Sequence, residues 1–267
     1  MGKITYWRAS SRLFFSELVG TALLVLGGLS FVIVMFGEGS RVAAFLPDEG
    51  VRRAITGFLF GLTGALIAVS PVGLESGAHI NPAVTLGFWL MGKLESRVAI
   101  GYALAQIGGA CLGALPLLIW GSLGRSVEFG ATAPGAGYSA WAALIGEAVT
   151  TFALIAGLCI FLGFRKLRPY TPALMPPLFS FMVYAEAPIS GTSCNPARSF
   201  GPAIISGEWD SWWIYWVGPV IGTLAATLVC SFLARRIEMA KVYRFDSDPH
   251  GLFRRMANRG AENSGLG

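Results

Sequence analysis

Long apolar stretches recur along the whole chain and alternate with short polar connections. A helix needs about 20 predominantly apolar residues to cross a hydrocarbon core of about 30 Å. Six stretches approach or exceed this length, and we predict membrane spans at residues 13–36, 52–71, 97–120, 139–163, 171–187 and 212–234. The first is the clearest, because Glu17 is its only ionisable residue.

Two shorter apolar pieces, residues 84–91 and 199–205, lie between spans two and three and between spans five and six. Each follows an Asn-Pro-Ala triplet and is too short to cross the membrane. Partial crossings occur at membrane depth only where protein or a water-filled cavity covers them. The pattern therefore predicts an all-α membrane protein with six transmembrane helices and two re-entrant half-helices.

Composition agrees with burial in lipid. Charged residues make up 13% of the 267 residues and hydrophobic residues 54%, with a mean hydropathy of +0.61. A soluble domain carries about a quarter charged residues, so the composition argues against a large soluble protein. The first stretch is too long for a removable signal peptide, and it lacks a small-residue cleavage site.

No feature of the sequence points to a cofactor, a metal or nucleic acid. The four cysteines are widely spaced and three lie in apolar stretches, so we interpret them as buried thiols. The two histidines, His79 and His250, cannot form a metal cluster. The net charge of +5 and pI near 9.2 would suit nucleic acid, but the positive charges flank the spans, which indicates membrane topology instead.

Lys and Arg concentrate on one side of the predicted membrane. Six spans place both termini on that side, where the termini and two connections contain 15 of the 20 basic residues. The opposite loops contain four, Arg41, Arg52, Arg53 and Arg125. Because positive charge favours the cytoplasmic side, we predict cytoplasmic termini in a plasma or inner membrane. The basic tail from Arg235 is expected to be solvated or to contact anionic lipid headgroups.

An internal repeat is the strongest signal. Residues 76–87 follow the pattern Ser-Gly-x-x-x-Asn-Pro-Ala-x-Thr-x-Gly, and residues 190–201 repeat it with Ser in place of Thr. Each half also carries a Glu-x-x-x-Thr motif, at Glu17 and at Glu147. Since each half contains three spans, an odd number, the second copy enters the membrane from the opposite side. The sequence thus predicts an inverted repeat.

The predicted boundaries follow from this repeat. They are a cytoplasmic N-terminus at residues 1–11, a first repeat at 12–125, an external loop at 126–138, a second repeat at 139–235 and a cytoplasmic tail at 236–267.

The two triplets, Asn81-Pro82-Ala83 and Asn195-Pro196-Ala197, have the chemistry of helix starts. Asn is a favoured N-cap, and Pro suits the first turn because its missing N–H is not needed there. Two such half-helices would point their positive dipole ends at each other across the midplane. Water held by both Asn amides could not relay protons, and the positive field would repel cations. One triplet indicates no more than a capped helix, whereas the pair indicates a pore.

These motifs resemble the aquaporin, or major intrinsic protein, family. The resemblance rests on the doubled Ser-Gly-x-x-x-Asn-Pro-Ala, the paired Glu-x-x-x-Thr, and Asn-Pro-Ala-Arg-Ser-Phe-Gly-Pro-Ala at residues 195–203, and it covers roughly residues 12–235. It implies a passive, non-enzymatic channel in the lipid bilayer that conducts water and assembles as a homotetramer. It also implies that the carboxylates of Glu17 and Glu147 accept backbone N–H groups from the loops before the half-helices, and that His79 braces the first loop.

The resemblance further implies a selectivity filter made of Phe60, Val183, Thr192 and Arg198. An arginine near the mouth supplies donors to water and a barrier to cations; an interfacial, salt-bridged arginine is the alternative. Val183 departs from the water-selective pattern, which commonly has histidine, and should make one wall wider and less polar. The prolines of span five could shift the register and place Tyr184 or Met182 nearer the lumen.

By the same resemblance, Ser199, Ala203 and the pair Tyr215-Trp216 match the water-selective pattern. Glycerol facilitators typically carry an acidic residue directly after the arginine, and this chain does not. We therefore expect a water channel that also passes small neutral solutes such as hydrogen peroxide or ammonia. A facilitator of glycerol, small polyols or metalloids with the same fold is the alternative.

Three other classes fit less well. A secondary transporter also shows inverted repeats but needs coupling-ion ligands, and we count only Glu17, Glu147 and Arg198 as ionisable candidates in the membrane segments. A membrane enzyme would need clustered Ser, His and Asp, metal ligands or a phosphate loop, and the sequence suggests none of these. A structural junction protein of the same fold would show no water permeability.

Overall fold

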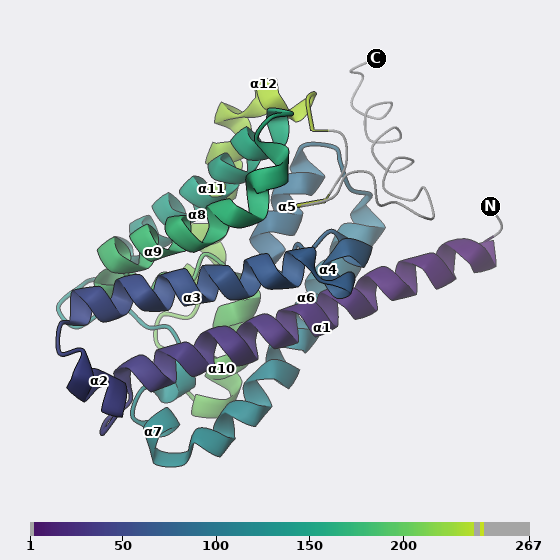
Figure 1. Cartoon of the computed structure of the whole chain (residues 1–267). Coiled ribbons are helices and arrows are strands. Elements are labelled where there is room, and N and C mark those ends of the chain that lie inside the picture. The colour runs from purple at the N-terminus through teal and green to yellow at the C-terminus, as the bar shows by residue number, and fades with distance from the viewer. Residues whose placement is uncertain (1–2, 238–240, 243–267) are drawn as a thin grey trace.

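The computed structural model describes residues 3–237 and 241–242, and every regular element in these residues is a helix (Figure 1). Six helices match the predicted spans: α1 Lys3–Phe36, α3 Glu49–Val69, α6 Ser96–Ala114, α8 Ala140–Gly163, α9 Thr171–Ser190 and α11 Ile214–Val229. Two match the half-helices, α5 Pro82–Leu90 and α10 Pro196–Ser206. The connections contain α2 Arg41–Phe45, α4 Pro71–Ser76, α7 Gly121–Arg125, α12 Ser231–Ala234, and 3-10 turns at Leu115–Trp120, Glu128–Gly130 and Arg168–Tyr170.

The structure adjusts some boundaries of the predicted spans. In the described part of the chain, four segments are long and apolar enough to cross a membrane: Ser10–Phe36, Glu49–Val69, Ser96–Arg125 and Ala140–Gly163. The sixth span was predicted too long, because α11 ends at Val229 and α12 follows as a separate turn. The prolines of span five do not interrupt α9, which continues through Pro176 and Pro177.

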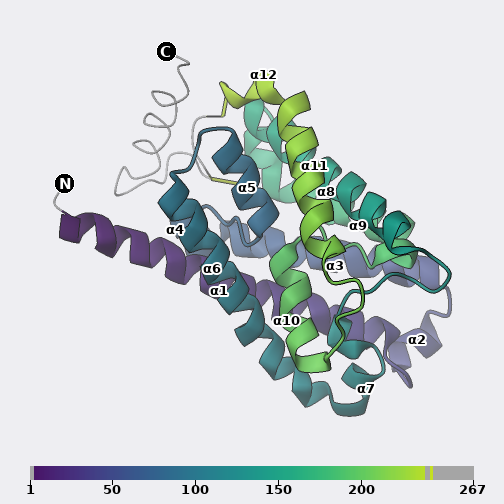
Figure 2. The same cartoon turned by 180° about the vertical axis from the view of Figure 1, so that it is seen from behind.

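The predicted helix starts are confirmed. Asn81 is the N-cap of α5, and its side-chain oxygen accepts the N–H of Ala83 at 2.8 Å. Asn195 caps α10 in the same way and accepts the N–H groups of Ala197 at 3.1 Å and Arg198 at 3.3 Å. Proline occupies the first turn of both half-helices. Figure 2 shows α5 and α10 one above the other within the bundle.

Glycines allow the long helices to approach backbone to backbone. A Cβ at Gly109 of α6 would lie 2.2 Å from the carbonyl oxygen of Leu18 on α1, and one at Gly222 of α11 would lie 2.3 Å from that of Ala148 on α8. The crossing of α3 and α9 is equally close, because a Cβ at Gly57 would lie 2.3 Å from a carbonyl of α9. Small residues at crossings are typical of membrane helices. These glycines let the long helices pack into one bundle.

Part of the tail is buried, whereas a solvated segment was predicted from Arg235; Arg235 and Arg236 themselves are exposed. Ile237, Lys241 and Val242 are each no more than 5% exposed. The Lys241 ammonium donates to the carbonyl of Leu74 near the end of α4 at 2.7 Å, and the Val242 N–H donates to the carbonyl of Gly77 at 3.0 Å. A cation is stabilised at the carbonyl end of a helix. The lipid contacts predicted for the later tail residues lie outside the described residues.

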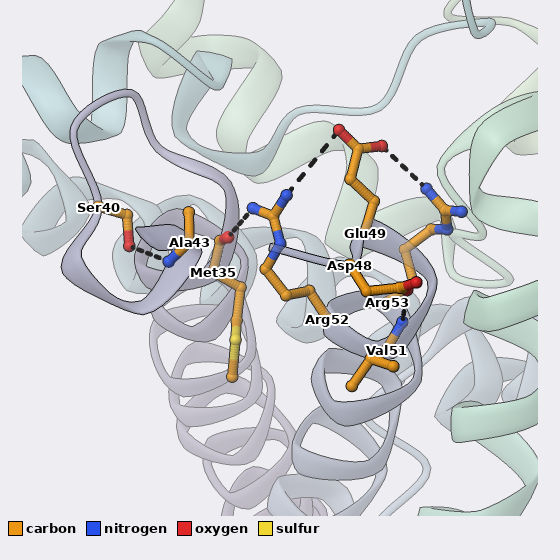
Figure 3. Close-up of polar contacts among 8 residues, drawn as sticks. All are labelled: Met35, Ser40, Ala43, Asp48, Glu49, Val51, Arg52 and Arg53. Atoms are coloured by element: carbon orange, nitrogen blue, oxygen red, sulfur yellow. Dashed lines mark hydrogen bonds and ion pairs between the residues drawn. The ribbon is translucent and has the colours of Figure 1, made fainter. Parts of the chain in front are cut away.

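Arg52, which we counted among the basic residues of the outer loops, is instead a buried anchor in α3 (Figure 3). Its guanidinium donates to the carbonyl of Met35, in the last turn of α1, at 2.7 Å. It also lies 5.0 Å from the ring centre of Phe36 and 3.9 Å from the carboxylate of Glu49. Arg53 contacts only Glu49 in Figure 3, at 3.3 Å, from a more exposed position. Arg52 therefore ties the end of α1 to α3.

We expect Arg52→Met to lower the free energy of unfolding by about 1.5–3 kcal/mol, the usual contribution of a hydrogen bond to a charged group. Arg53→Met is the matched control, and it should cost about 1 kcal/mol or less because its ion pair is partly exposed. Thermal unfolding of both variants in mild detergent measures the difference. Equal losses of stability would contradict the anchoring role of Arg52.

Candidate pore and filter

The two Asn caps are linked across the centre of the bundle. The side-chain amide of Asn81 donates to the carbonyl of Cys194 at 2.8 Å, and that of Asn195 donates to the carbonyl of Ile80 at 3.0 Å. Each cap thus holds the loop that precedes the opposite half-helix. An Asn amide nitrogen carries two hydrogens, so each cap retains a second N–H that it can offer to the lumen.

A cavity of about 70 Å³, called the central cavity below, contacts both Asn81 and Asn195. A buried water needs on the order of 10–15 Å³ of such space, so the cavity has room for a few water molecules. Its polar wall comes from the two caps with His79 and Ser193. The remaining lining is mainly apolar and includes Leu24, Phe60, Leu154, Leu158, Phe179 and, from the tail, Val242. A few polar groups on an otherwise apolar wall suit the passage of water, because a channel's selectivity depends on the donors and acceptors that line it.

Buried carboxylates hold the two loops in mirrored arrangements. Glu17, fully buried in α1, accepts the N–H groups of His79 at 3.0 Å and Ile80 at 2.7 Å, together with the side-chain amide of Gln106 at 2.7 Å. These backbone donors are the ones that the resemblance assigns to this carboxylate. Ile80 has a φ of +42°, which is uncommon outside glycine. The carboxylate therefore stabilises a backbone shape that the chain would not otherwise adopt.

The second repeat uses Glu147 of α8 in the same way. Its carboxylate accepts the N–H groups of Ser193 at 2.7 Å and Cys194 at 2.8 Å, and the hydroxyl of Ser190 at 2.6 Å. Cys194 has a φ of +51°, which matches the strained position of the first loop. The inverted repeat thus extends from the sequence motif to the hydrogen bonds.

His79 contacts α5 from the first loop. Its ring stacks on Phe88 at a centroid distance of 4.6 Å, and its Nδ1 lies 3.2 Å from the hydroxyl of Thr85. The side chain is 2% exposed and contributes to the lining of the central cavity. These contacts fit the bracing role that the resemblance implies.

Phe60 and Arg198, two of the predicted filter residues, lie close together. The Arg198 guanidinium is 5.8 Å from the ring centre of Phe60, and it donates to the carbonyl of Gly130 at 2.8 Å. Arg198 is 5% exposed and forms no ion pair with any residue that the structure describes, which argues against the salt-bridged alternative. Sequence reasoning missed Phe179, which stacks on Phe60 at 5.9 Å and also lines the central cavity.

Val183 lies on α9 beside α3, because a Cβ at Gly57 would be 2.8 Å from the Val183 Cβ. Gly57 is one turn from Phe60 on α3. Val183 therefore packs against α3 about one helical turn from Phe60, where α9 crosses α3. Tyr184, the alternative, is 54% exposed and its ring approaches Gly50 at the start of α3. Met182, the other alternative, is buried in the apolar core of the bundle.

Our count of ionisable residues in the spans was wrong, because it omitted Glu186 near the end of α9. This carboxylate is 7% exposed and accepts the hydroxyl of Thr192 at 2.5 Å. The sequence carried the signal, since an acidic residue inside residues 171–187 is as unusual as Glu17 or Glu147. In the described part of the chain, His, Cys, Asp and Glu form no group of three that could hold a metal.

The sequence is similar to a known family of membrane proteins. The family model for the major intrinsic proteins matches residues 3–230. The probable aquaporin TIP2-2 of Arabidopsis thaliana is 34% identical over 224 residues, which are 83% of this chain and 86% of that protein. Aquaporin AqpM of Methanothermobacter marburgensis is 33% identical over 229 residues, 76% of this chain and 93% of that protein.

A solved structure has a similar fold. The X-ray structure of the aquaglyceroporin from Plasmodium falciparum aligns with a TM-score of 0.67 over 85% of this chain and 96% of that one, at 19% sequence identity. At this identity the likeness concerns the fold alone.

Proposed function

The chain belongs to the major intrinsic protein family, and on that premise we propose what its pore conducts. The pore passes small neutral solutes in addition to water, and it excludes protons and ions. Members of this family are channels and not enzymes, and the aquaporin relatives make the chain a passive water channel in the membrane. One observation carries the proposal: Asn81 and Asn195, from two opposed half-helices, contact one cavity and each other's loops. Hydrogen peroxide and ammonia are the solutes that we propose.

Proton exclusion follows from the direction of the donors. The second N–H of each Asn cap would donate to the oxygen of a passing water and turn its hydrogens away from the midplane. Such a water cannot accept a proton from one neighbour and pass it to the next. The positive ends of α5 and α10 face the same point, and their field opposes any cation.

We propose that Phe60, Val183, Thr192 and Arg198 form the narrowest part of the pore. The approach of Arg198 to Phe60 at 5.8 Å supports two of these positions. The contact of Val183 with Gly57, one turn from Phe60, supports a third. Because Val183 offers Arg198 no polar partner across the lumen, the constriction should be less polar than one with histidine. Solutes larger than water should then pass more easily.

Val183→His is expected to reduce the ratio of urea flux to water flux on the order of fivefold, the size of one hydrogen-bonding change at about 1 kcal/mol. Stopped-flow light scattering of proteoliposomes under sucrose and urea gradients measures this ratio. Tyr184→His is the matched control, because Tyr184 is exposed on the same helix. An unchanged ratio in Val183→His together with a changed ratio in Tyr184→His would mean that the filter assignment is wrong.

The names of the relatives do not favour the glycerol-facilitator alternative, since the sequence matches named above are aquaporins. Glu186 adds an ionisable group that a secondary transporter could use, but family membership makes the chain a channel. A glycerol gradient in the same stopped-flow experiment tests the alternative directly. Glycerol permeation as fast as that of water would favour it.

We also propose the orientation predicted above, with both termini and the tail from residue 236 in the cytoplasm and the loop at 126–138 outside. The uneven distribution of Lys and Arg supports this orientation. A plasma or inner membrane is the location that we propose.

We expect a homotetramer with one pore per subunit. This proposal rests on the chain's membership of the major intrinsic protein family. The glycines at the helix crossings do not support assembly, because Gly109, Gly113 and Gly222 pack against helices of the same chain. Native mass spectrometry in mild detergent should give a mass of four chains. A stable monomer as the main species would contradict this prediction.

A further inference from the structure

Glu186 lies at the junction of α9, α8 and the loop before α10. It follows Val183 by three residues, so the two side chains lie on the same side of α9, one turn apart. Its carboxylate packs against Gly146 of α8, where a Cβ would be 2.2 Å from the Glu186 Oε1. A glycine at this point of α8 is therefore required to admit the carboxylate.

The two oxygens of this carboxylate have different surroundings. Oε2 accepts the hydroxyl of Thr192 at 2.5 Å, whereas Oε1 is buried and has no donor among the described residues. The hydroxyl of Ser190, nearby in the chain, donates to Glu147 at 2.6 Å. A half-satisfied carboxylate is costly to bury. The hydrogen bond from the Thr192 hydroxyl is thus a contact that stabilises this carboxylate.

Thr192 needs such a contact. Its φ is +51°, a conformation in which a β-branched residue is strained. Its backbone N–H donates to the hydroxyl of Ser190 at 3.2 Å, and its own hydroxyl donates to Glu186. A hydroxyl has one hydrogen to donate. With that hydrogen directed to Glu186, the Thr192 hydroxyl retains only its capacity to accept.

We propose that Glu186 is a positioning residue of the filter, which fixes Thr192 as an acceptor opposite the donors of Arg198. The proposal rests on the filter proposed above, in which Phe60 and Val183 supply no polar group. Arg198 is then the donor side of the constriction and Thr192 the acceptor side. Loss of Glu186 frees the Thr192 hydroxyl to rotate and to donate, and it relaxes the strained loop. The selectivity of the pore changes as a result.

Glu186→Leu and Glu186→Gln separate this role from simple packing. Gln keeps the size of the side chain and an oxygen that can accept from Thr192, so its ratio of urea flux to water flux should stay near that of the wild type. Leu removes the acceptor, and the ratio should change by about threefold or more, the order expected for one hydrogen bond. Because Glu186 acts through Thr192, Glu186→Leu in a Thr192→Val background should add no further change.

Each outcome has a defined meaning. If Thr192→Val and Arg198→Val change the ratio and Glu186→Leu does not, the Glu186 proposal is overturned while the filter stands. Independent, multiplying effects of Glu186→Leu and Thr192→Val would overturn it as well. If neither Thr192→Val nor Arg198→Val changes the ratio, the filter itself is wrong.

A second variant covers the case in which Glu186→Leu fails to fold. Gly146→Ala displaces the same carboxylate from the α8 side, because the added Cβ would overlap Oε1. It should shift the flux ratio in the direction of Glu186→Leu. A folded Gly146→Ala channel with the wild-type ratio would overturn the proposal.

Discussion

Replacing Glu147 by leucine is expected to abolish water permeation and to lower the free energy of unfolding by about 3 kcal/mol or more. The carboxylate accepts hydrogen bonds from Ser190, Ser193 and Cys194, and leucine accepts none. Each buried donor left without a partner costs about 1–3 kcal/mol. The loop would also lose the shape that presents the Cys194 carbonyl to Asn81. Thermal unfolding and stopped-flow water flux measure the two effects.

Glu147→Gln is the control, because its single side-chain oxygen retains part of the acceptor capacity and should leave an intermediate stability. Glu17→Leu should have an effect of similar size, since Glu17 holds the first loop through His79, Ile80 and Gln106. A Glu147→Leu channel with wild-type stability and water flux would contradict the role assigned to both carboxylates.

Arg198→Val is expected to leave water flux nearly unchanged and to admit monovalent cations. A unit charge at about 4 Å contributes about 4 kcal/mol at the effective dielectric constant of a partly hydrated site. Since about 1.4 kcal/mol corresponds to a tenfold change in rate, cation passage should rise on the order of a hundredfold or more. Fluxes of sodium or potassium into proteoliposomes that contain an ion-sensitive dye measure this.

Two variants serve as controls for this experiment. Arg125→Val removes an exposed arginine from α7 and should leave cations excluded. Arg198→Lys keeps the charge but not the fork of donors, so it should retain cation exclusion. Cation exclusion that persists in Arg198→Val would show that the half-helix dipoles suffice without the arginine.

The spans and half-helices could be predicted because their signals are local. An apolar stretch of membrane length and an Asn-Pro helix start each depend on neighbouring residues alone, and the caps at Asn81 and Asn195 are confirmed. The end of span six at Val229 was missed, because hydropathy continues across the break before α12. Local hydropathy therefore does not show where α11 ends and α12 begins.

Features that depend on distant contacts could not be predicted. Phe179 is one apolar residue among many in α9, and only its stack on Phe60 marks it. The basic tail from Arg235 was predicted to be solvated, yet its Lys241 is buried, and a carbonyl of α4 accepts its ammonium. The contact of Glu186 with Thr192 requires both the strained loop and the space at Gly146. These are properties of packing between helices that are far apart in sequence.

Water flux and proton flux measured together on the same proteoliposomes test the central claim most directly. Stopped-flow light scattering reports water flux, and a pH-sensitive dye inside the vesicles reports protons. The opposed caps Asn81 and Asn195 predict fast osmotic shrinkage with a proton leak no greater than that of empty liposomes. Vesicles that shrink no faster than empty ones, or a proton leak that rises with the water flux, would contradict the account.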